Sequence, residues 1–201
     1  MSSESTLSPS EPIYEGKAKR LYRTEDAAVL LSRFKDDATA FNAQKRDTIA
    51  GKGRLNCAIS TYLFQHLAAH GVPTHWLKTL NETDMLVKAV TIVPLEVVVR
   101  NIAAGSLCKQ TGLELGLQLP QPIVEFYYKN DELGDPLLTP ERLQLLNLAT
   151  PEQVETLRSQ ALQINQLLIQ FFADCGITLV DFKLEFGLDT EQHIILADEI
   201  S

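Results

Sequence analysis

The stretch Leu179-Val-Asp-Phe-Lys-Leu-Glu-Phe-Gly187 combines the alternation of a β-strand with a cluster of charged side chains. Successive side chains of an extended strand point to opposite faces. One face therefore carries Asp181, Lys183 and Glu185. The other face carries only apolar side chains, namely Phe182, Leu184 and Phe186. The pattern predicts a strand with one face on a hydrophobic core and a charged face opposite.

A second short strand is expected directly after this one. Residues 187–192 have the composition of a turn, and residues 193–197 predict the return strand of a hairpin. The hairpin brings Asp198 back beside the first strand, at a register that only a structure defines.

A lysine between carboxylates on one strand face fits the chemistry of a magnesium site. Magnesium binds carboxylate oxygens, keeps several waters and bridges to phosphates. A lysine among the acids can neutralise a phosphate or a substrate carboxylate. The alternative is a solvated strand face with an incidental salt bridge, and an isolated D-x-K-x-E pattern favours that alternative.

The composition indicates a globular protein of one domain or two small lobes. The 201 residues are 45% hydrophobic and 22% charged, which suffices for a real core. The net charge of -8 argues against general nucleic-acid binding. The sequence has no apolar run near the roughly 20 residues of a membrane span. Residues 1–12 are rich in Ser, Glu and Pro, so a disordered tail is expected there and not a signal peptide.

The cysteines indicate a cytoplasmic location. Cys57, Cys108 and Cys175 are odd in number and far apart. This pattern fits a reducing compartment and argues against a zinc site or a disulfide framework.

The folded part begins with a strand-turn-strand pattern at residues 13–22. Gly16 allows a close backbone approach, and Lys17 and Lys19 add positive charge beside it. Such a turn can cover a polyphosphate with N–H groups and ammonium charge. The signal is weak alone, because the phosphate-loop pattern G-x-x-x-x-G-K-[ST] is absent from the sequence.

The rest of the first half predicts strands around one helix. Strands are expected at residues 27–34, 74–77, 85–90 and 95–99. Between the first two, residues 42–54 form a basic, glycine-bearing loop that is either solvated or a lid. A helix is expected at residues 55–69, and its core face carries Leu55, Ile59, Tyr62, Leu63 and Leu67. Residues 91–94 read as a linker. The expected N-terminal lobe is therefore residues 13–93, and the expected C-terminal lobe is residues 94–201.

The segment at residues 100–106 has two interpretations. Arg100 follows an apolar strand and offers a planar fork for a phosphate or carboxylate, and Ser106 adds a hydroxyl. Alternatively, Asn101 and Ser106 only cap a short helix at residues 107–110.

The second half predicts one strand and one long helix before the hairpin. Residues 120–122 read as a turn into a strand at 123–128, followed by a polar loop at 129–136. In that loop Asn130, Asp131 and Asp135 read as turn formers more readily than as substrate contacts. Thr150-Pro-Glu-Gln153 is a capping box for a helix at residues 151–175, and Gly176 ends that helix.

Five stretches together resemble the SAICAR synthetase family, the phosphoribosylaminoimidazole-succinocarboxamide synthases. The resemblance runs from about residue 13 to the last residue, in order. The stretches are Tyr14-Glu-Gly-Lys-Ala-Lys-Arg-Leu-Tyr22, Val93-Pro-Leu-Glu-Val-Val-Val-Arg-Asn-Ile-Ala-Ala-Gly-Ser106, Tyr128-Lys-Asn-Asp131 with Asp135-Pro136, Leu179–Gly187 and Ala197-Asp-Glu-Ile-Ser201.

The resemblance implies an ATP-dependent, amide-forming ligase of purine biosynthesis. L-aspartate is joined to the carboxylate of carboxyaminoimidazole ribonucleotide (CAIR) through an acyl phosphate, with ADP and phosphate released. The implied cofactors are ATP and Mg²⁺, and the implied partners are these small molecules, without nucleic acid or membrane; a homodimer stays open. The implied fold class is α+β with two lobes: a kinase-like antiparallel β lobe, a C-terminal α/β lobe, and ATP in the cleft between them.

The family's residue roles fall on particular positions of this sequence. Lys183 and Asp181 take the catalytic positions near CAIR and the transferred phosphate, and Glu185 and Asp198 take the metal positions. The ATP-binding positions are Gly16, Lys17, Ala18, Lys19, Lys88 and Glu96. The substrate-binding positions are Arg100, Ser106, Asp37 and Lys129, with Asp36 in the same loop as Asp37.

The sequence also departs from the family's pattern. Family members continue past the acidic strand with Ser-Pro-Asp, an arginine-bearing segment and terminal helices, whereas this sequence stops at Ser201. The sequence leaves two explanations open: the chain is a fragment of a longer protein, or the natural protein is truncated after Ser201. Two alternative functions therefore remain: a kinase-like phosphotransferase, and a non-catalytic nucleotide-binding fragment. The first lacks support from an H-R-D-x-x-x-x-N catalytic loop or a G-x-G-x-x-G pattern in the sequence.

Overall fold

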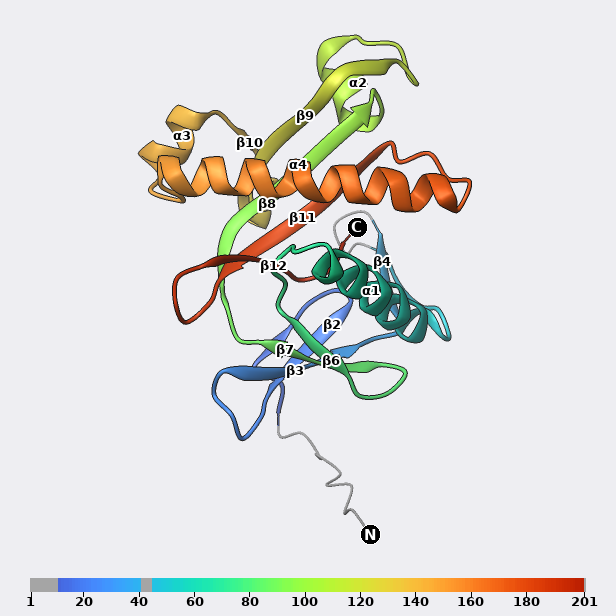
Figure 1. The fold of residues 1–201 in the computed structure, drawn as a ribbon, viewed down its shortest axis with the longest axis vertical. Coiled ribbons are helices and arrows are strands. Elements are labelled where there is room, and N and C mark those ends of the chain that lie inside the picture. Colours follow the sequence, from blue (N-terminus) through green and yellow to red (C-terminus); the bar gives the residue numbers. More distant parts are fainter. Residues whose placement is uncertain (1–10, 41–44, 201) are drawn as a thin grey trace. The chain divides into compact units, whose positions relative to one another are not determined.

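The structure is a computed structural model that describes residues 11–40 and 45–200 (Figure 1). Most of the expected tail at residues 1–12 and part of the loop at residues 42–54 lie outside the described residues. The chain divides into two compact units, residues 1–65 with 75–89 and residues 66–74 with 90–201. The lobe boundary expected after residue 93 stays a prediction, as does a nucleotide cleft. No helix in the described part of the chain is long and apolar enough to cross a membrane.

The first unit contains a five-stranded antiparallel sheet of order β1-β2-β3-β7-β6. Its strands are β1 (Tyr14–Glu15), β2 (Lys19–Arg23), β3 (Val29–Phe34), β7 (Asp84–Lys88) and β6 (Trp76–Thr79). Strands β4 (Asp37–Ala40) and β5 (Lys45–Thr48) form a separate pair. The strand-turn-strand expected at residues 13–22 is confirmed by the pairing of β1 with β2.

Helix α1 (Lys52–Ala69) confirms the predicted helix and part of its predicted buried face, because Leu63 and Leu67 are 4% and 0% exposed. Leu55, Ile59 and Tyr62 are 58%, 55% and 61% exposed. The buried face also includes two small residues, Cys57 and Ser60. Cys57 joins Phe34, Met85 and Val87 in the core of the first unit. A cysteine and a serine carry little weight in an apolar periodicity, so the sequence pattern identified only part of the buried face.

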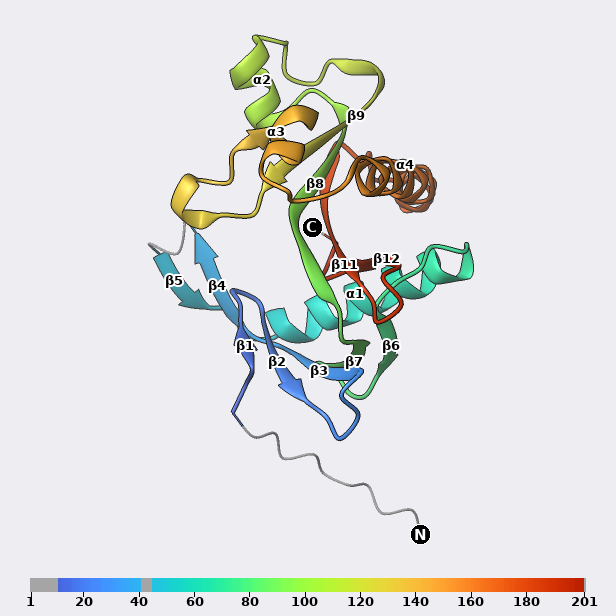
Figure 2. The same cartoon turned by 90° about the vertical axis from the view of Figure 1, so that its left-hand side faces the viewer.

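The second unit is built on a five-stranded sheet of order β10-β9-β8-β11-β12 (Figures 1 and 2). Its strands are β8 (Thr91–Ile102), β9 (Gln118–Tyr128), β10 (Leu137–Leu138), β11 (Asp181–Leu188) and β12 (Ile194–Ala197). The helical segments are α2 (Gly105–Thr111), the 3₁₀ turn η1 (Asp131–Leu133), α3 (Pro140–Leu145) and α4 (Pro151–Asp174). Antiparallel sheets with separate helices confirm the predicted α+β class.

Helix α4 covers the apolar face of this sheet, as Figures 1 and 2 show from two sides. Four of its side chains are completely buried: Leu157, Ala161, Ile164 and Leu168. On the sheet, Val97, Val99, Leu184 and Phe186 are equally buried. The predicted helix ends are confirmed, because Thr150 and Gln153 form the capping box and Gly176 follows the helix with φ 73°.

Two segments that the sequence predicts as a linker and a turn belong to strands in the structure. The expected linker at residues 91–94 belongs to β8, and the expected turn at residues 120–122 belongs to β9. In both places the pairing shifts register. The pairing of β8 with β11 shifts between Glu185 and Gly187 of β11, and the pairing of β9 with β8 shifts between Arg100 and Ile102 of β8. A proline has no N–H group to donate to the neighbouring strand, and a β-bulge tolerates this missing hydrogen bond. The prolines therefore mark bulges here and not strand ends.

Candidate active site

One face of the second sheet gathers the charged side chains of three strands. Antiparallel pairing sets Asp181 opposite Arg100 and Glu185 opposite Glu96. The next pair of strands sets Tyr127 opposite Glu96 and Glu125 opposite Val98. Directly opposed residues share a face. The charged face thus comprises Glu96, Arg100, Glu125, Tyr127, Asp181, Lys183 and Glu185. The predicted alternation of β11 is confirmed, since Phe182, Leu184 and Phe186 are 5%, 0% and 0% exposed.

Arg100 lies at the centre of a hydrogen-bond network on the charged face. Its Nε donates to Glu125 at 2.6 Å and its Nη1 to Asp181 at 3.3 Å. Its Nη2 donates to Ser106 at 2.9 Å and to Tyr127 at 3.2 Å. Burial opposes the charge of Arg100, but the hydrogen bonds to Glu125 and Tyr127 outweigh it and raise its pKa.

The capping interpretation of residues 100–106 is wrong. The N-cap of α2 is Ala104, whose methyl side chain cannot accept a hydrogen bond. The Ser106 hydroxyl accepts from Arg100, as described above. Asn101 exchanges two hydrogen bonds with Asn165 of α4, at 2.8 Å and 2.9 Å. Ser106 therefore belongs to the charged face, whereas Asn101 ties the strand to the helix behind it.

Lys183 is held as a cation between two acids. Its Nζ donates to Glu96 at 2.8 Å and lies 3.9 Å from a carboxylate oxygen of Glu185. Burial disfavours the ammonium form, but the hydrogen bond and charge of Glu96 outweigh burial and raise the pKa of Lys183. Lys183 is consequently suited to neutralising negative charge and not to accepting a proton at neutral pH.

Glu185 and Asp198 form a pair of acids at one end of this face. Glu185 is 4% exposed and accepts a hydrogen bond from Lys129. It pairs with Ala197, so Asp198 follows immediately, with φ 59°. Burial and the negative charge of Asp198 raise the pKa of Glu185, while Lys129 and Lys183 oppose that shift. A buried carboxylate beside a second one favours a bound cation.

This donor set fits magnesium better than a metal held entirely by protein. In the described residues no group of three or more His, Cys, Asp and Glu side chains is placed to hold a metal ion. Magnesium characteristically takes one or two carboxylates and completes its shell with water and substrate phosphates. Glu185 and Asp198 supply such a pair.

The turn Gly16–Lys19 joins β1 to β2 in the first unit. The Gly16 N–H donates to the Lys19 carbonyl at 2.9 Å, so this N–H is engaged within the turn. Glu15 braces the turn through Arg20 at 3.0 Å and Lys35 at 2.7 Å. The hydrogen bonds from Arg20 and then Lys35 lower the pKa of Glu15 to about 2. The exposed Lys17 projects from a stiffened turn, and a role for this turn in ATP binding stays a prediction.

Three other predicted site residues also belong to the first unit. Asp36 accepts hydrogen bonds from the N–H groups of Gly51 and Gly53, at 3.2 Å and 2.8 Å, and so caps the start of α1. Asp37 pairs with Lys35 at 2.7 Å. Lys88 ends β7 with an exposed side chain. Asp36 thus has a structural function, whereas substrate binding by Asp37 and ATP binding by Lys88 stay predictions.

The turn interpretation of Asn130 and Asp135 is confirmed. The Asn130 side chain accepts from the Leu133 N–H at 3.2 Å, and Asp135 accepts from the Asn130 N–H at 2.9 Å. This turn fixes the chain just after Lys129.

Two residues of the charged face were not expected from the sequence. Glu125 and Tyr127 both bind Arg100, and the Tyr127 hydroxyl also donates to Glu125 at 3.0 Å. The strand pattern at residues 123–128 already put both side chains on one face, but it could not reveal which strand would lie beside it.

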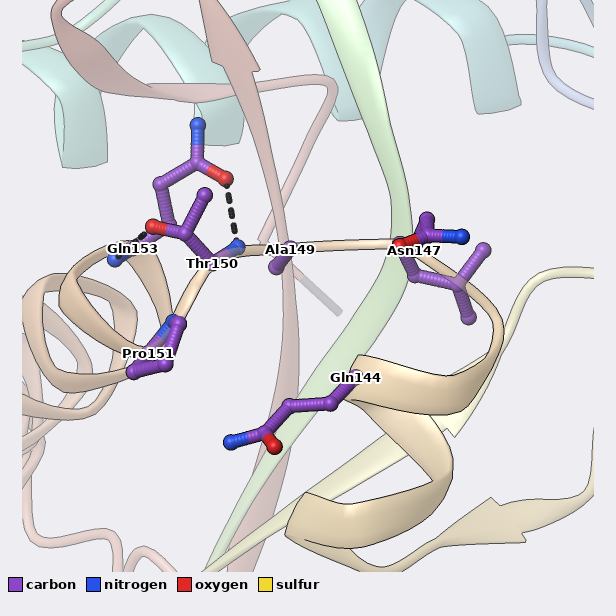
Figure 3. A pocket seen from close by; sticks show the side chains of 7 residues that line it. Gln144, Asn147, Ala149, Thr150, Pro151 and Gln153 are labelled. Atoms are coloured by element: carbon purple, nitrogen blue, oxygen red, sulfur yellow. Dashed lines mark hydrogen bonds between the residues drawn. The ribbon is translucent and has the colours of Figure 1, made fainter.

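A pocket of about 350 Å³ lies elsewhere in the second unit, at the turn between α3 and α4 (Figure 3). Figure 3 shows Thr150 and Gln153 closing their capping box at its edge. All the lining residues are uncharged: Gln144, Asn147, Leu148, Ala149, Thr150, Pro151 and Gln153. A triphosphate or a dicarboxylate needs cationic partners, so the charged face is the better candidate site.

Comparisons with known proteins agree on one family. The family described as SAICAR synthetase matches residues 12–201. A phosphoribosylaminoimidazole-succinocarboxamide synthase of Acaryochloris marina is 65% identical over 97% of this chain and 80% of its own. The crystal structure of the Ehrlichia chaffeensis enzyme of that name has a TM-score of 0.91 and 44% identity, over 95% of this chain and 82% of its own. A SAICAR synthetase in complex with ADP has a TM-score of 0.90 and 45% identity, over 94% of this chain and 80% of its own. The chain belongs to the SAICAR synthetase family.

Proposed function

We propose that the charged face is where this chain carries out the family's reaction. As a SAICAR synthetase family member, the chain is an ATP-dependent ligase of purine biosynthesis. Its reaction joins L-aspartate to the carboxylate of CAIR and releases ADP and phosphate. The kinase-like phosphotransferase and the non-catalytic fragment are not favoured by these relatives.

The chemistry needs a cationic environment more than a nucleophilic side chain. A carboxylate is a poor acyl donor, so the CAIR carboxylate first attacks the γ-phosphate and becomes an acyl phosphate. The aspartate amine then displaces phosphate. Phosphoryl transfer depends mainly on alignment and on stabilising the developing negative charge. Lys183, fixed by Glu96 at 2.8 Å, is placed to provide that stabilisation.

The substrate positions follow from the same network. Arg100 and Ser106 are proposed to hold the phosphate or carboxylate of CAIR, with Lys129 as a further cation. Asp181 is 37% exposed while bonded to Arg100, so it faces the same substrate position. Gly16, Lys17, Ala18, Lys19, Lys88 and Glu96 are proposed to contact ATP, for which the similar ADP complex gives general support.

Magnesium is proposed to be held by Glu185 and Asp198. When bound, it would supply positive charge that offsets the charge of the nucleotide phosphates. The cation between these acids would replace part of the positive charge that Lys129 and Lys183 now provide. A homodimer and a cytoplasmic location stay predictions.

The observation that carries the proposal is the position of Lys183 between Glu96 and Glu185, and Glu185 in turn lies beside Asp198. The test is product formation with ATP, CAIR and L-aspartate, and with each omitted in turn. SAICAR formation that requires all three supports the ligase. ATP turnover that ignores L-aspartate would favour the kinase-like alternative, and nucleotide binding without any product would favour the non-catalytic one. Lys109, exposed on α2, offers a matched control, because Lys109→Ala can be compared with Lys183→Ala.

A further inference from the structure

The guanidinium of Arg100 is held on several sides at once. Nε is bound by Glu125, and Nη2 is bound by both Ser106 and Tyr127. The guanidinium is planar, so bonds at Nε and Nη2 together fix its plane and its rotation. The remaining nitrogen of the guanidinium, Nη1, faces Asp181.

The two acids that bind Arg100 differ in their surroundings. The side chain of Glu125 is 12% exposed, and that of Asp181 is 37% exposed. The bond to Glu125 is short, at 2.6 Å, and the same carboxylate oxygen accepts from Tyr127. The bond to Asp181 is longer, at 3.3 Å. Glu125 is thus the more buried partner of Arg100, whereas Asp181 lies on the accessible side of the guanidinium.

We propose that Glu125, supported by the Tyr127 hydroxyl, is a positioning residue that aims the Nη1 edge of Arg100 at an oxyanion of CAIR. The inference rests on the proposed function of Arg100. An arriving phosphate or carboxylate approaches Nη1 on the side of Asp181 and finds the guanidinium already oriented. Preorganised donors bind an anion without first losing rotational freedom.

Loss of the Glu125 charge has a defined consequence. Among the described partners of Arg100, Asp181 then remains the one carboxylate. The guanidinium turns toward Asp181, which competes with the oxyanion of the substrate. Affinity for CAIR falls, while ATP binding and the transfer step change little, because the hydrogen bonds described for Glu125 join it to Arg100 and Tyr127 and to none of the residues proposed to bind ATP or metal.

The test compares Glu125→Gln with wild type and with Glu132→Gln, an exposed acid of η1. The Gln side chain keeps the size and one acceptor oxygen of Glu125. CAIR binding is measured by calorimetry without ATP, and the Michaelis constants of CAIR and ATP are measured separately. We expect about tenfold weaker CAIR binding in Glu125→Gln and a CAIR Michaelis constant raised about as much. The ATP constant and kcat should stay within about twofold, and Glu132→Gln should match wild type.

Tyr127→Phe provides a second variant that removes a single oxygen. About threefold weaker CAIR binding is expected. Unchanged CAIR binding in both variants would overturn the inference, and so would equal losses for CAIR and ATP together with lower thermal stability. A wild-type chain that binds CAIR but forms no SAICAR contradicts the proposed function alone. A wild-type chain that does not bind CAIR overturns both.

Discussion

Lys183 donates a 2.8 Å hydrogen bond to Glu96 on the neighbouring strand, and this bond fixes its ammonium group on the charged face. The two strands are far apart in sequence but adjacent in the sheet. A lysine tail is flexible, so a defined position requires such a partner. The Asp-x-Lys-x-Glu pattern of β11 therefore depends on β8 for its geometry.

Loss of either charge at the centre of the face should reduce turnover. We expect Lys183→Ala and Glu185→Ala each to lower kcat by more than about tenfold, because each removes charge from the phosphoryl-transfer site. Circular dichroism should show both variants folded. Turnover equal to wild type in either variant would favour the alternative interpretation, in which this strand face is solvated and carries only an incidental salt bridge.

Replacement of Arg100 should affect binding and stability together. Arg100→Ala removes the fork for CAIR, so its Michaelis constant should rise with a smaller change in kcat. The variant also leaves the nearly buried Glu125 without its cation. Such a loss typically lowers the free energy of unfolding by on the order of 3 kcal/mol. Urea unfolding measures the second effect, and an unchanged Michaelis constant would restrict Arg100 to a structural role.

Gly187 is required by the close approach of the chain at Val90. A β-carbon on Gly187 would lie 2.5 Å from Cγ2 and 2.7 Å from Cβ of Val90. Gly187→Ala should therefore lower the free energy of unfolding by about 1–3 kcal/mol. Val90→Ala in the same chain should recover part of this loss. Additive losses in the double variant would contradict the predicted clash.

The amide pair between Asn101 and Asn165 should be strongly coupled. The two residues are 6% and 1% exposed, and each donates to the other. Asn165→Ala leaves a buried amide without its partner, which should cost about 1–3 kcal/mol. The double variant Asn101→Ala with Asn165→Ala should lose less than the sum of the single variants. Full additivity in urea unfolding would mean that the pair contributes little.

Asp84 should make stability depend on pH in the acid range. Burial alone would raise its pKa, but two 2.8 Å hydrogen bonds from Arg33 and one from Asn81 outweigh burial and lower it. With a folded pKa below 3.8, this stabilisation is present above pH 3.8 and is lost as the pH falls through the folded pKa. The difference in unfolding free energy between wild type and Asp84→Asn should shrink from pH 6 toward pH 2.5. A constant difference would exclude Asp84 as the titrating group.

The sequence predicted best where the signal is local. The alternation of β11, the capping box at Thr150 and the helix stop at Gly176 each depend on neighbours within a few residues, and the structure confirms all of them. The hairpin that places Asp198 beside Glu185 was predictable for the same reason.

The remainder depends on strands brought together from distant parts of the chain. Arg100 could be identified as an anion-binding candidate, but its partner Glu125 lies 25 residues away on another strand. Pro94 read as a linker, because the bulge that accommodates it is formed jointly with β11. The buried face of α1 was predicted only in part, since Cys57 and Ser60 pack inward while Leu55, Ile59 and Tyr62 face outward.

The most direct test is a crystal structure of this chain with ADP and manganese, recorded at the manganese absorption edge. We predict an anomalous peak within coordination distance of Glu185, Asp198 and the nucleotide phosphates. Bound nucleotide with its metal away from both acids, and with Lys129 still on Glu185, would contradict the assignment of the charged face as the active site.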